Sequence, residues 1–131
     1  MPVSQLPLVT GETLNTRSLN DKPTVYYFFA PWCKVCEYSI DNLTALEPQW
    51  REDKVNVLII ALDYSSLNEV TAYIDRHQLP FPVALGSRTI AERYKINGYP
   101  TYYIADAEGI LNWVSVGYST ELGLITRLQL L

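Results

Sequence analysis

Cys33 and Cys36 are the only two cysteines in the chain, and two residues separate them. When thiols at this spacing share the first turn of a helix, their sulfurs lie within disulfide distance. Such a pair can alternate between a dithiol and a disulfide: one thiolate attacks a disulfide in a partner, and the second thiol resolves the product. This chemistry requires a helix that begins at the pair.

The residues on either side of the cysteines predict a strand followed by a helix. Residues 24–30 are mostly β-branched or aromatic, as in a buried strand, and Pro31 ends the run. Beyond the pair, apolar residues recur every three or four positions, as on one face of a helix: Ile40, Leu43, Leu46 and Trp50. This helix is expected to reach about residue 52, with a kink or an end at Pro48.

The first turn of a helix favours a thiolate at Cys33 because its backbone N–H groups and the helix dipole stabilise negative charge. The neighbouring Lys34 should act in the same direction, and Glu37 in the opposite one. Cys36 shares the apolar face with Ile40 and should therefore be buried and less ionised. We expect Cys33 to be the exposed nucleophile and Cys36 the resolving thiol.

Other roles for the cysteine pair have to be weighed. A structural disulfide across so short a loop would restrain little of the unfolded chain. A structural zinc site needs four ligands, and the remaining soft donors are His77 and Met1, so no metal site is predicted. A copper(I) ion held by the two thiolates alone is the metal alternative that stays open.

Length and composition indicate one domain covering residues 1–131, in which residues 1–22 form a lead-in hairpin or strand. A net charge of −4 without a Lys/Arg cluster argues against a nucleic-acid partner. No apolar run approaches the length needed to span a membrane, and the start of the chain lacks the features of a signal peptide. We expect a monomer.

Further along the chain, turn and capping residues alternate with apolar runs. Strands are predicted at 55–62, 81–85, 102–105 and 110–116; helices are predicted from Ser66 to near His77, from Ser87 through Tyr94, and from Ser119 or Thr120 onward, with Leu122, Ile125, Leu128 and Gln129 near the inner face of the last. This order of elements predicts an α/β layer fold with a mixed sheet. The cysteine pair would lie at the carboxyl ends of its strands, where such sheets place their sites.

The segment Phe29-Ala30-Pro31-Trp32-Cys33-Lys34-Val35-Cys36 resembles the active-site signature of the thioredoxin superfamily, and Gly98-Tyr99-Pro100-Thr101 resembles its cis-proline loop. The lead-in, the inserted segment 81–94 and the turn 106–109 are similar to the TlpA-like thiol–disulfide oxidoreductases. The ending 117–124 resembles a bacterial group associated with suppression of copper sensitivity. The resemblance covers nearly the whole chain.

The resemblance implies a thioredoxin-like three-layer fold with a TlpA-like insertion and a cis peptide bond between Tyr99 and Pro100. It also implies that Trp32, Tyr99, Pro100 and Thr101 bind the substrate, with the backbone of Tyr99 open to pair with an incoming chain. No cofactor is required. TlpA-like relatives usually act on the extracytoplasmic face of the inner membrane, in the periplasm, as soluble domains tethered by an N-terminal helix.

The chain departs from the family at the positions that handle the proton of the second cysteine. Where many thioredoxins carry a buried acid on the central strand, this chain has Tyr27. Where some TlpA-like reductases carry a glutamate three residues after the second cysteine, it has Ser39. Asp63, at the end of the next strand, is a substitute candidate, although a solvated strand end is the simpler role.

These observations predict a thiol–disulfide oxidoreductase that acts on protein disulfides or dithiols and exchanges electrons with a redox partner, such as a membrane electron donor. Its direction, reductive or oxidative, stays open. One alternative is a copper(I) carrier or sensor that uses the same thiolates. Another is a partner-binding module with idle cysteines, because fold alone does not determine function.

Overall fold

The apolar run before the cysteines forms the central strand of the protein. The computed structural model describes residues 1–117, 123–124 and 127–128. Strand β3 (Thr24–Phe29) has every residue buried and pairs in parallel with β4 (Asn56–Ala61). On its other side it pairs antiparallel with β6 (Thr101–Ala105). A strand enclosed by neighbours and covered on both faces must be apolar throughout, which explains the run.

Among the residues that the structure describes, two further strands complete a five-stranded mixed sheet with the order β5-β4-β3-β6-β7. Strand β5 (Val83–Leu85) is parallel to β4, and β7 (Leu111–Val116) is antiparallel to β6. The tight turn between β6 and β7 has Gly109 at φ +83°, where glycine is favoured. The predicted mixed α/β sheet is confirmed.

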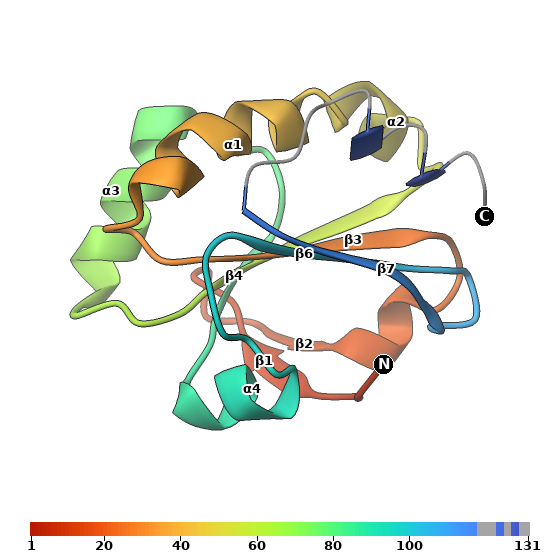
Figure 1. Cartoon of the computed structure of the whole chain (residues 1–131), viewed down its shortest axis with the longest axis horizontal. Coiled ribbons are helices and arrows are strands. Elements are labelled where there is room, and N and C mark those ends of the chain that lie inside the picture. Colours follow the sequence, from red (N-terminus) through yellow and green to blue (C-terminus); the bar gives the residue numbers. More distant parts are fainter. Residues whose placement is uncertain (118–122, 125–126, 129–131) are drawn as a thin grey trace.

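Helices cover both faces of the sheet (Figure 1). Helices α1 (Lys34–Thr44) and α3 (Leu67–His77) lie on one face, with the short α2 (Glu47–Arg51) beyond α1. The other face carries α4 (Arg88–Arg93) and an N-terminal hairpin of β1 (Gln5–Pro7) and β2 (Thr13–Asn15), followed by a 3-10 turn over Thr16–Leu19. Alternate residues of β3 therefore contribute to two apolar cores.

The helix after the cysteines is shorter than predicted. Instead of continuing to about residue 52, α1 ends at Thr44 and a separate α2 begins at Glu47. Pro48 occupies the first turn of α2, where its missing N–H costs no helical hydrogen bond. The helix is therefore interrupted between Thr44 and Glu47, and Pro48 lies in the first turn of the new helix.

The predicted capping residues start the next two helices. Ser66 accepts a hydrogen bond from the backbone of Glu69 at α3, and Ser87 accepts one from Ile90 at α4. The predicted start of a last helix at Ser119 or Thr120, with Leu122, Ile125 and Gln129, lies outside the described residues. Most of the segment 117–124 that resembles the copper-sensitivity group also lies outside them.

Candidate active site

Cys33 is the N-cap residue of α1, at the point where β3 has ended and the helix begins. Its backbone N–H donates to the carbonyl of Ala30 at 3.0 Å, which holds the turn between them. Its sulfur accepts a hydrogen bond from the backbone N–H of Cys36 at 3.2 Å. This contact uses one of the free N–H groups of the first helical turn, and such a donor stabilises a thiolate.

Both cysteines are free thiols, but Cys33 is less accessible than expected. Only 7% of its surface is exposed, and Cys36 is fully buried in the core between α1 and the sheet. Cys33 is enclosed because it belongs to that core cluster, against which Tyr99 also packs. Burial raises the pKa of the Cys36 thiol well above its usual value, and the adjacent Cys33 sulfur adds to the effect.

The loop before β6 forms a wall beside the cysteines. The Tyr99–Pro100 peptide bond is cis, the isomer that the motif implies, and Pro100 is buried. Thr101, also buried, donates its hydroxyl to the carbonyl of Gly98 at 2.7 Å. Burial raises the pKa of Tyr99, and Asp63 and the two cysteines act in the same direction.

Trp32 links the cysteine turn to the end of β4. Its indole N–H donates to the carbonyl of Asp63 at 3.0 Å, and its ring meets Tyr99 edge-on with centroids 5.8 Å apart. The indole is nevertheless 60% exposed. Two other large apolar side chains of the first turns of α1, Val35 and Tyr38, are exposed as well. The entrance to the site therefore has an aromatic and apolar rim.

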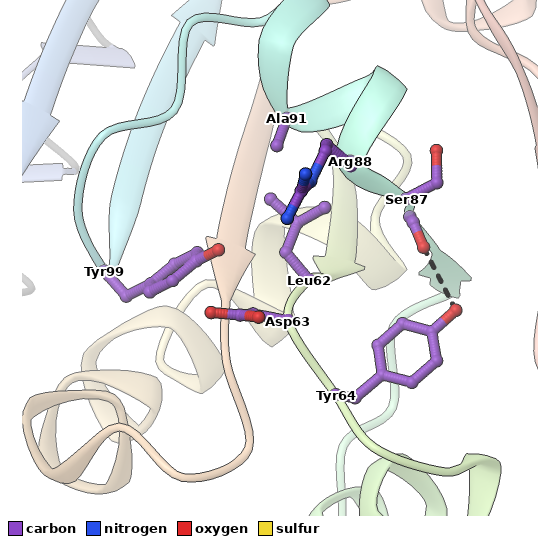
Figure 2. Close-up of a pocket in the computed structure, with 8 residues that line it drawn as sticks. Leu62, Asp63, Tyr64, Ser87, Arg88, Ala91 and Tyr99 are labelled. Carbon is purple, nitrogen blue, oxygen red and sulfur yellow. Dashed lines mark hydrogen bonds between the residues drawn. The ribbon is translucent and has the colours of Figure 1, made fainter.

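A cleft of about 500 Å³ opens next to this rim (Figure 2). Its lining combines apolar residues with one acidic and one basic side chain: Leu62, Asp63, Tyr64, Gly86, Ser87, Arg88, Ala91 and Tyr99. Tyr64 donates its hydroxyl to the carbonyl of Gly86 at 3.0 Å, which ties the β4 end to the β5 end. Tyr99 belongs to both the cleft and the cysteine site, so the two are continuous.

The charged neighbours of the cysteines do not act on them equally. Lys34 is exposed at the first position of α1. Glu37 is held by α3: its carboxylate lies 2.6 Å from Arg76 Nη2 and 2.6 Å from His77 Nε2. Burial by itself would raise the pKa of Glu37, but these two partners outweigh it and lower the pKa. The negative charge of Glu37 is therefore compensated before it can disfavour a Cys33 thiolate.

Beneath Cys36 lies a group of buried hydroxyls. The hydroxyls of Tyr27, from β3, and Ser39, from α1, are hydrogen-bonded at 2.7 Å. Tyr73, from α3, donates to the carbonyl of Cys36 at 2.8 Å. Asp63 is instead exposed in the cleft. Tyr27 and Ser39, which occupy the two positions where the resemblance led us to look for an acid, are thus hydrogen-bonded to each other in the core that holds Cys36.

The resemblance placed the cysteines, Trp32, Tyr99, Pro100 and Thr101 at one site. In the structure, Trp32 meets Tyr99, which packs against the core cluster that holds both cysteines, and Pro100 and Thr101 follow Tyr99 in the chain. The predictions from the sequence did not include Tyr73 or the cleft residues Tyr64 and Arg88. The spacing of Val70, Tyr73, Ile74 and His77 was a usable signal that Tyr73 faces the core; no comparable signal marks Tyr64 or Arg88. Within the described residues, no group of three or more His, Cys, Asp or Glu side chains could hold a metal ion, and no helix is long and apolar enough to cross a membrane.

A family model described as AhpC/TSA family matches residues 1–114, which is most of the chain. The chain belongs to the AhpC/TSA family. Among curated relatives, it is 26% identical over 133 residues to the thioredoxin-like protein YneN of Bacillus subtilis, covering 98% of this chain and 76% of that protein. It is 27% identical over 120 residues to the thiol-disulfide oxidoreductase ResA of Bacillus cereus, covering 91% of this chain and 69% of ResA.

The fold of this AhpC/TSA family member is that of a thioredoxin family protein. A crystal structure of a thiol:disulfide interchange protein of the thioredoxin family from Chlorobium tepidum matches with a TM-score of 0.88 at 23% identity. The match covers 98% of this chain and 92% of the other. The thioredoxin-like fold predicted from the two motifs is confirmed.

The Glu37 ion pairs of this family member should make its stability depend on acid pH. Because the folded state lowers the pKa of Glu37, the stabilisation is present above the unfolded value of about 4.5 and is lost as the pH falls through the lower folded value. Glu37→Gln should reduce the free energy of unfolding at neutral pH by up to about 1 kcal/mol. Urea unfolding should show this difference shrinking below about pH 4.5; a difference that is the same at all pH values would contradict the assignment.

Proposed function

We propose that this protein is a thiol–disulfide oxidoreductase that works through the Cys33/Cys36 pair. The observation that carries the proposal is the geometry of the first turn of α1. The Cys33 sulfur receives the Cys36 N–H at the helix start, while the Cys36 thiol is fully buried directly behind it. One sulfur therefore lies at the helix start, where it can attack a partner disulfide, and the other lies behind it, where it can attack the first sulfur and resolve the mixed disulfide.

In this mechanism, the Cys33 thiolate attacks one sulfur of a partner disulfide, and the other partner sulfur leaves as a thiolate. Cys36 then attacks the Cys33 sulfur, which forms the Cys33–Cys36 disulfide and frees the partner as a dithiol. The reverse sequence donates the disulfide to a partner. The chemistry uses only the two cysteines and requires no cofactor.

The partner is a protein disulfide or dithiol that docks on the rim around Cys33. The exposed Trp32, Val35 and Tyr38 offer apolar contact, and an exposed aromatic and apolar group of this kind is typical of a protein-binding surface. The loop Tyr99-Pro100-Thr101 stands beside the cysteines, with the Tyr99 backbone available to an extended chain. Lys34 and Asp63 are both exposed, so their charges would influence which partner surfaces bind at the rim.

The cellular location and the redox partner that we propose follow from the TlpA-like resemblance. A monomeric domain of residues 1–131 would act on the periplasmic side of the inner membrane, tethered in a longer precursor and re-reduced or re-oxidised by a membrane electron donor. The apolar rim supports a macromolecular partner, and the direction of electron flow depends on the reduction potential of the pair. Equilibration of the pair with glutathione measures that potential directly.

The function is tested by the reduction of a protein disulfide with dithiothreitol as the electron source. The wild-type protein should accelerate the reduction of insulin disulfides, and Cys33→Ser should abolish the acceleration because it removes the attacking sulfur. A parallel titration of the reduced protein with copper(I) tests the carrier alternative. Tight stoichiometric copper binding without any acceleration of disulfide reduction would overturn the proposal.

A further inference from the structure

The resolving step needs a thiolate at a place that disfavours one. Cys36 is fully buried, and burial raises the pKa of its thiol. Within the described residues, the groups that influence its protonation include the Cys33 sulfur, the backbone of Ala30 and the Tyr27 hydroxyl, and the Tyr73 and Tyr99 hydroxyls interact with it electrostatically. The nearest acids are engaged elsewhere: Glu37 is paired with α3, and Asp63 is exposed in the cleft. Because neither of these carboxylates acts on Cys36, stabilisation of its thiolate has to come from a neutral hydroxyl.

Tyr27 and Ser39 come from the two elements that enclose Cys36. Ser39 follows Cys36 by three residues on α1, so it lies on the same helical face one turn further on. Tyr27 lies on the central strand with its side chain in the core beneath α1. Both residues are fully buried, and their hydroxyls are 2.7 Å apart. Tyr27 and Cys36 belong to the same core cluster; burial raises the pKa of the Cys36 thiol, and the Tyr27 hydroxyl acts in the opposite direction.

We propose that Tyr27, oriented by Ser39, donates the hydrogen bond that stabilises the Cys36 thiolate during resolution. The inference rests on the proposed oxidoreductase function and names a positioning pair within it. If Ser39 donates to the Tyr27 oxygen, the single Tyr27 proton is free to point at the Cys36 sulfur. Burial raises the pKa of Tyr27 far above its usual value, so this hydroxyl keeps its proton and can donate it in a hydrogen bond to the Cys36 sulfur.

The hydroxyls of Tyr73 and Tyr99 are less suited to act on the Cys36 sulfur. Tyr73 donates to the backbone carbonyl of Cys36 at 2.8 Å, which fixes the helix turn rather than the sulfur. Tyr99 lies at the opposite, solvent side of the site, where it lines the cleft. Of these three tyrosines, Tyr27 is thus the one whose side chain is fully buried and whose hydroxyl does not bind the Cys36 backbone.

The chemical step balances without another reagent. The Cys36 sulfur loses its proton and forms a bond to the Cys33 sulfur. The bond between Cys33 and the partner sulfur breaks, and the partner sulfur leaves with the bonding electron pair. The leaving thiolate takes up the proton that Cys36 gave up, and Tyr27 begins and ends the step protonated.

An aryl disulfide that releases a coloured thiolate separates the two steps. Attack by Cys33 releases the first equivalent, and resolution by Cys36 releases the second. In stopped-flow mixing, Tyr27→Phe should slow the second phase by about tenfold or more, because a hydrogen bond to a charged group is lost. The first phase should stay unchanged within about twofold, and the pH profile of the second phase should move to higher pH.

Tyr26→Phe is the matched control, because Tyr26 immediately precedes Tyr27 in β3 and is buried in the core on the other face of the sheet. It should alter neither phase. Ser39→Ala should slow the second phase less than Tyr27→Phe does, and the double variant should match Tyr27→Phe, because both residues act through one hydrogen bond. An intact first phase in each variant reports a folded site.

The outcomes separate this inference from the function on which it rests. If wild-type protein releases no second equivalent and does not accelerate insulin reduction, the proposed function fails. If wild-type protein shows both phases but Tyr27→Phe leaves the rate and pH profile of the second phase unchanged, the role of Tyr27 is overturned and the function stands. Equal slowing by Tyr26→Phe would also overturn it, because the effect would then come from packing.

Discussion

With Cys36 replaced by serine, Cys33 should form mixed disulfides with partner proteins that persist until a reductant is added. Cys33 can still attack a partner disulfide, because its place at the start of α1 does not depend on the Cys36 thiol. The release of the partner needs a second thiolate on the same chain, and Cys36 is the only other cysteine. Resolution of the mixed disulfide should therefore be almost completely blocked. Covalent complexes should accumulate in the compartment in which the protein works, and non-reducing gels of extracts from it should detect them.

Cys33→Ser is the matched control for this trap. The remaining Cys36 is fully buried, so it should capture few partners. A copper carrier would lose metal binding in both variants and would show no selective trapping. A binding module would keep its partners in both variants without a covalent link. If Cys36→Ser traps nothing from that compartment while wild-type protein reduces insulin, the two-cysteine mechanism is wrong.

Gly86→Ala should cause a large loss of stability at the end of β5. A Cβ added there would lie 2.5 Å from Leu62 Cδ2, 2.9 Å from the Ala61 carbonyl oxygen and 3.0 Å from Ile60 Cγ2. The backbone cannot withdraw easily, because Gly86 N–H donates to that same carbonyl at 2.8 Å. Overpacking of this kind costs about 1–3 kcal/mol, and the contact with backbone favours the upper part of that range.

Gly98→Ala is the comparison variant for this prediction. Its added Cβ would meet only Val116 Cγ1 at 3.2 Å, and Val116 is 62% exposed and free to adjust. We expect its effect to stay within about 0.5 kcal/mol. Urea unfolding of both variants measures the difference directly. Equal stabilities for the two alanine variants would show that the β4–β5 junction relaxes around the added methyl group.

Much of the fold could be predicted because it depends on local patterns. The buried run before Cys33 predicted the central strand, and Ser66 and Ser87 predicted helix starts that the structure shows within one residue. These signals are strong because a capping side chain bonds to the next turn of its own helix. The length of α1 was harder to predict, since the apolar spacing continues past its end to Trp50, which is in α2.

The accessibility of Cys33 could not be predicted from its neighbours in the chain. Its place at a helix start suggested exposure, but the residue belongs to the core cluster against which Tyr99, 66 positions later, packs. The same holds for Glu37. Its charge appeared to oppose a nearby thiolate until folding brought Arg76 and His77 from α3 against it. Both outcomes depend on contacts between distant segments.

The sequence by itself determined the reacting atoms, because two cysteines at a helix start after a buried strand define a dithiol couple through local geometry. The tertiary structure decided what surrounds them. Tyr27, Ser39 and Tyr73 come from β3, α1 and α3, and they meet around Cys36 only because the helices pack over the sheet. A buried thiol takes its electrostatic environment from whatever groups the core places within a few ångströms, and separation along the chain does not reveal which groups those are.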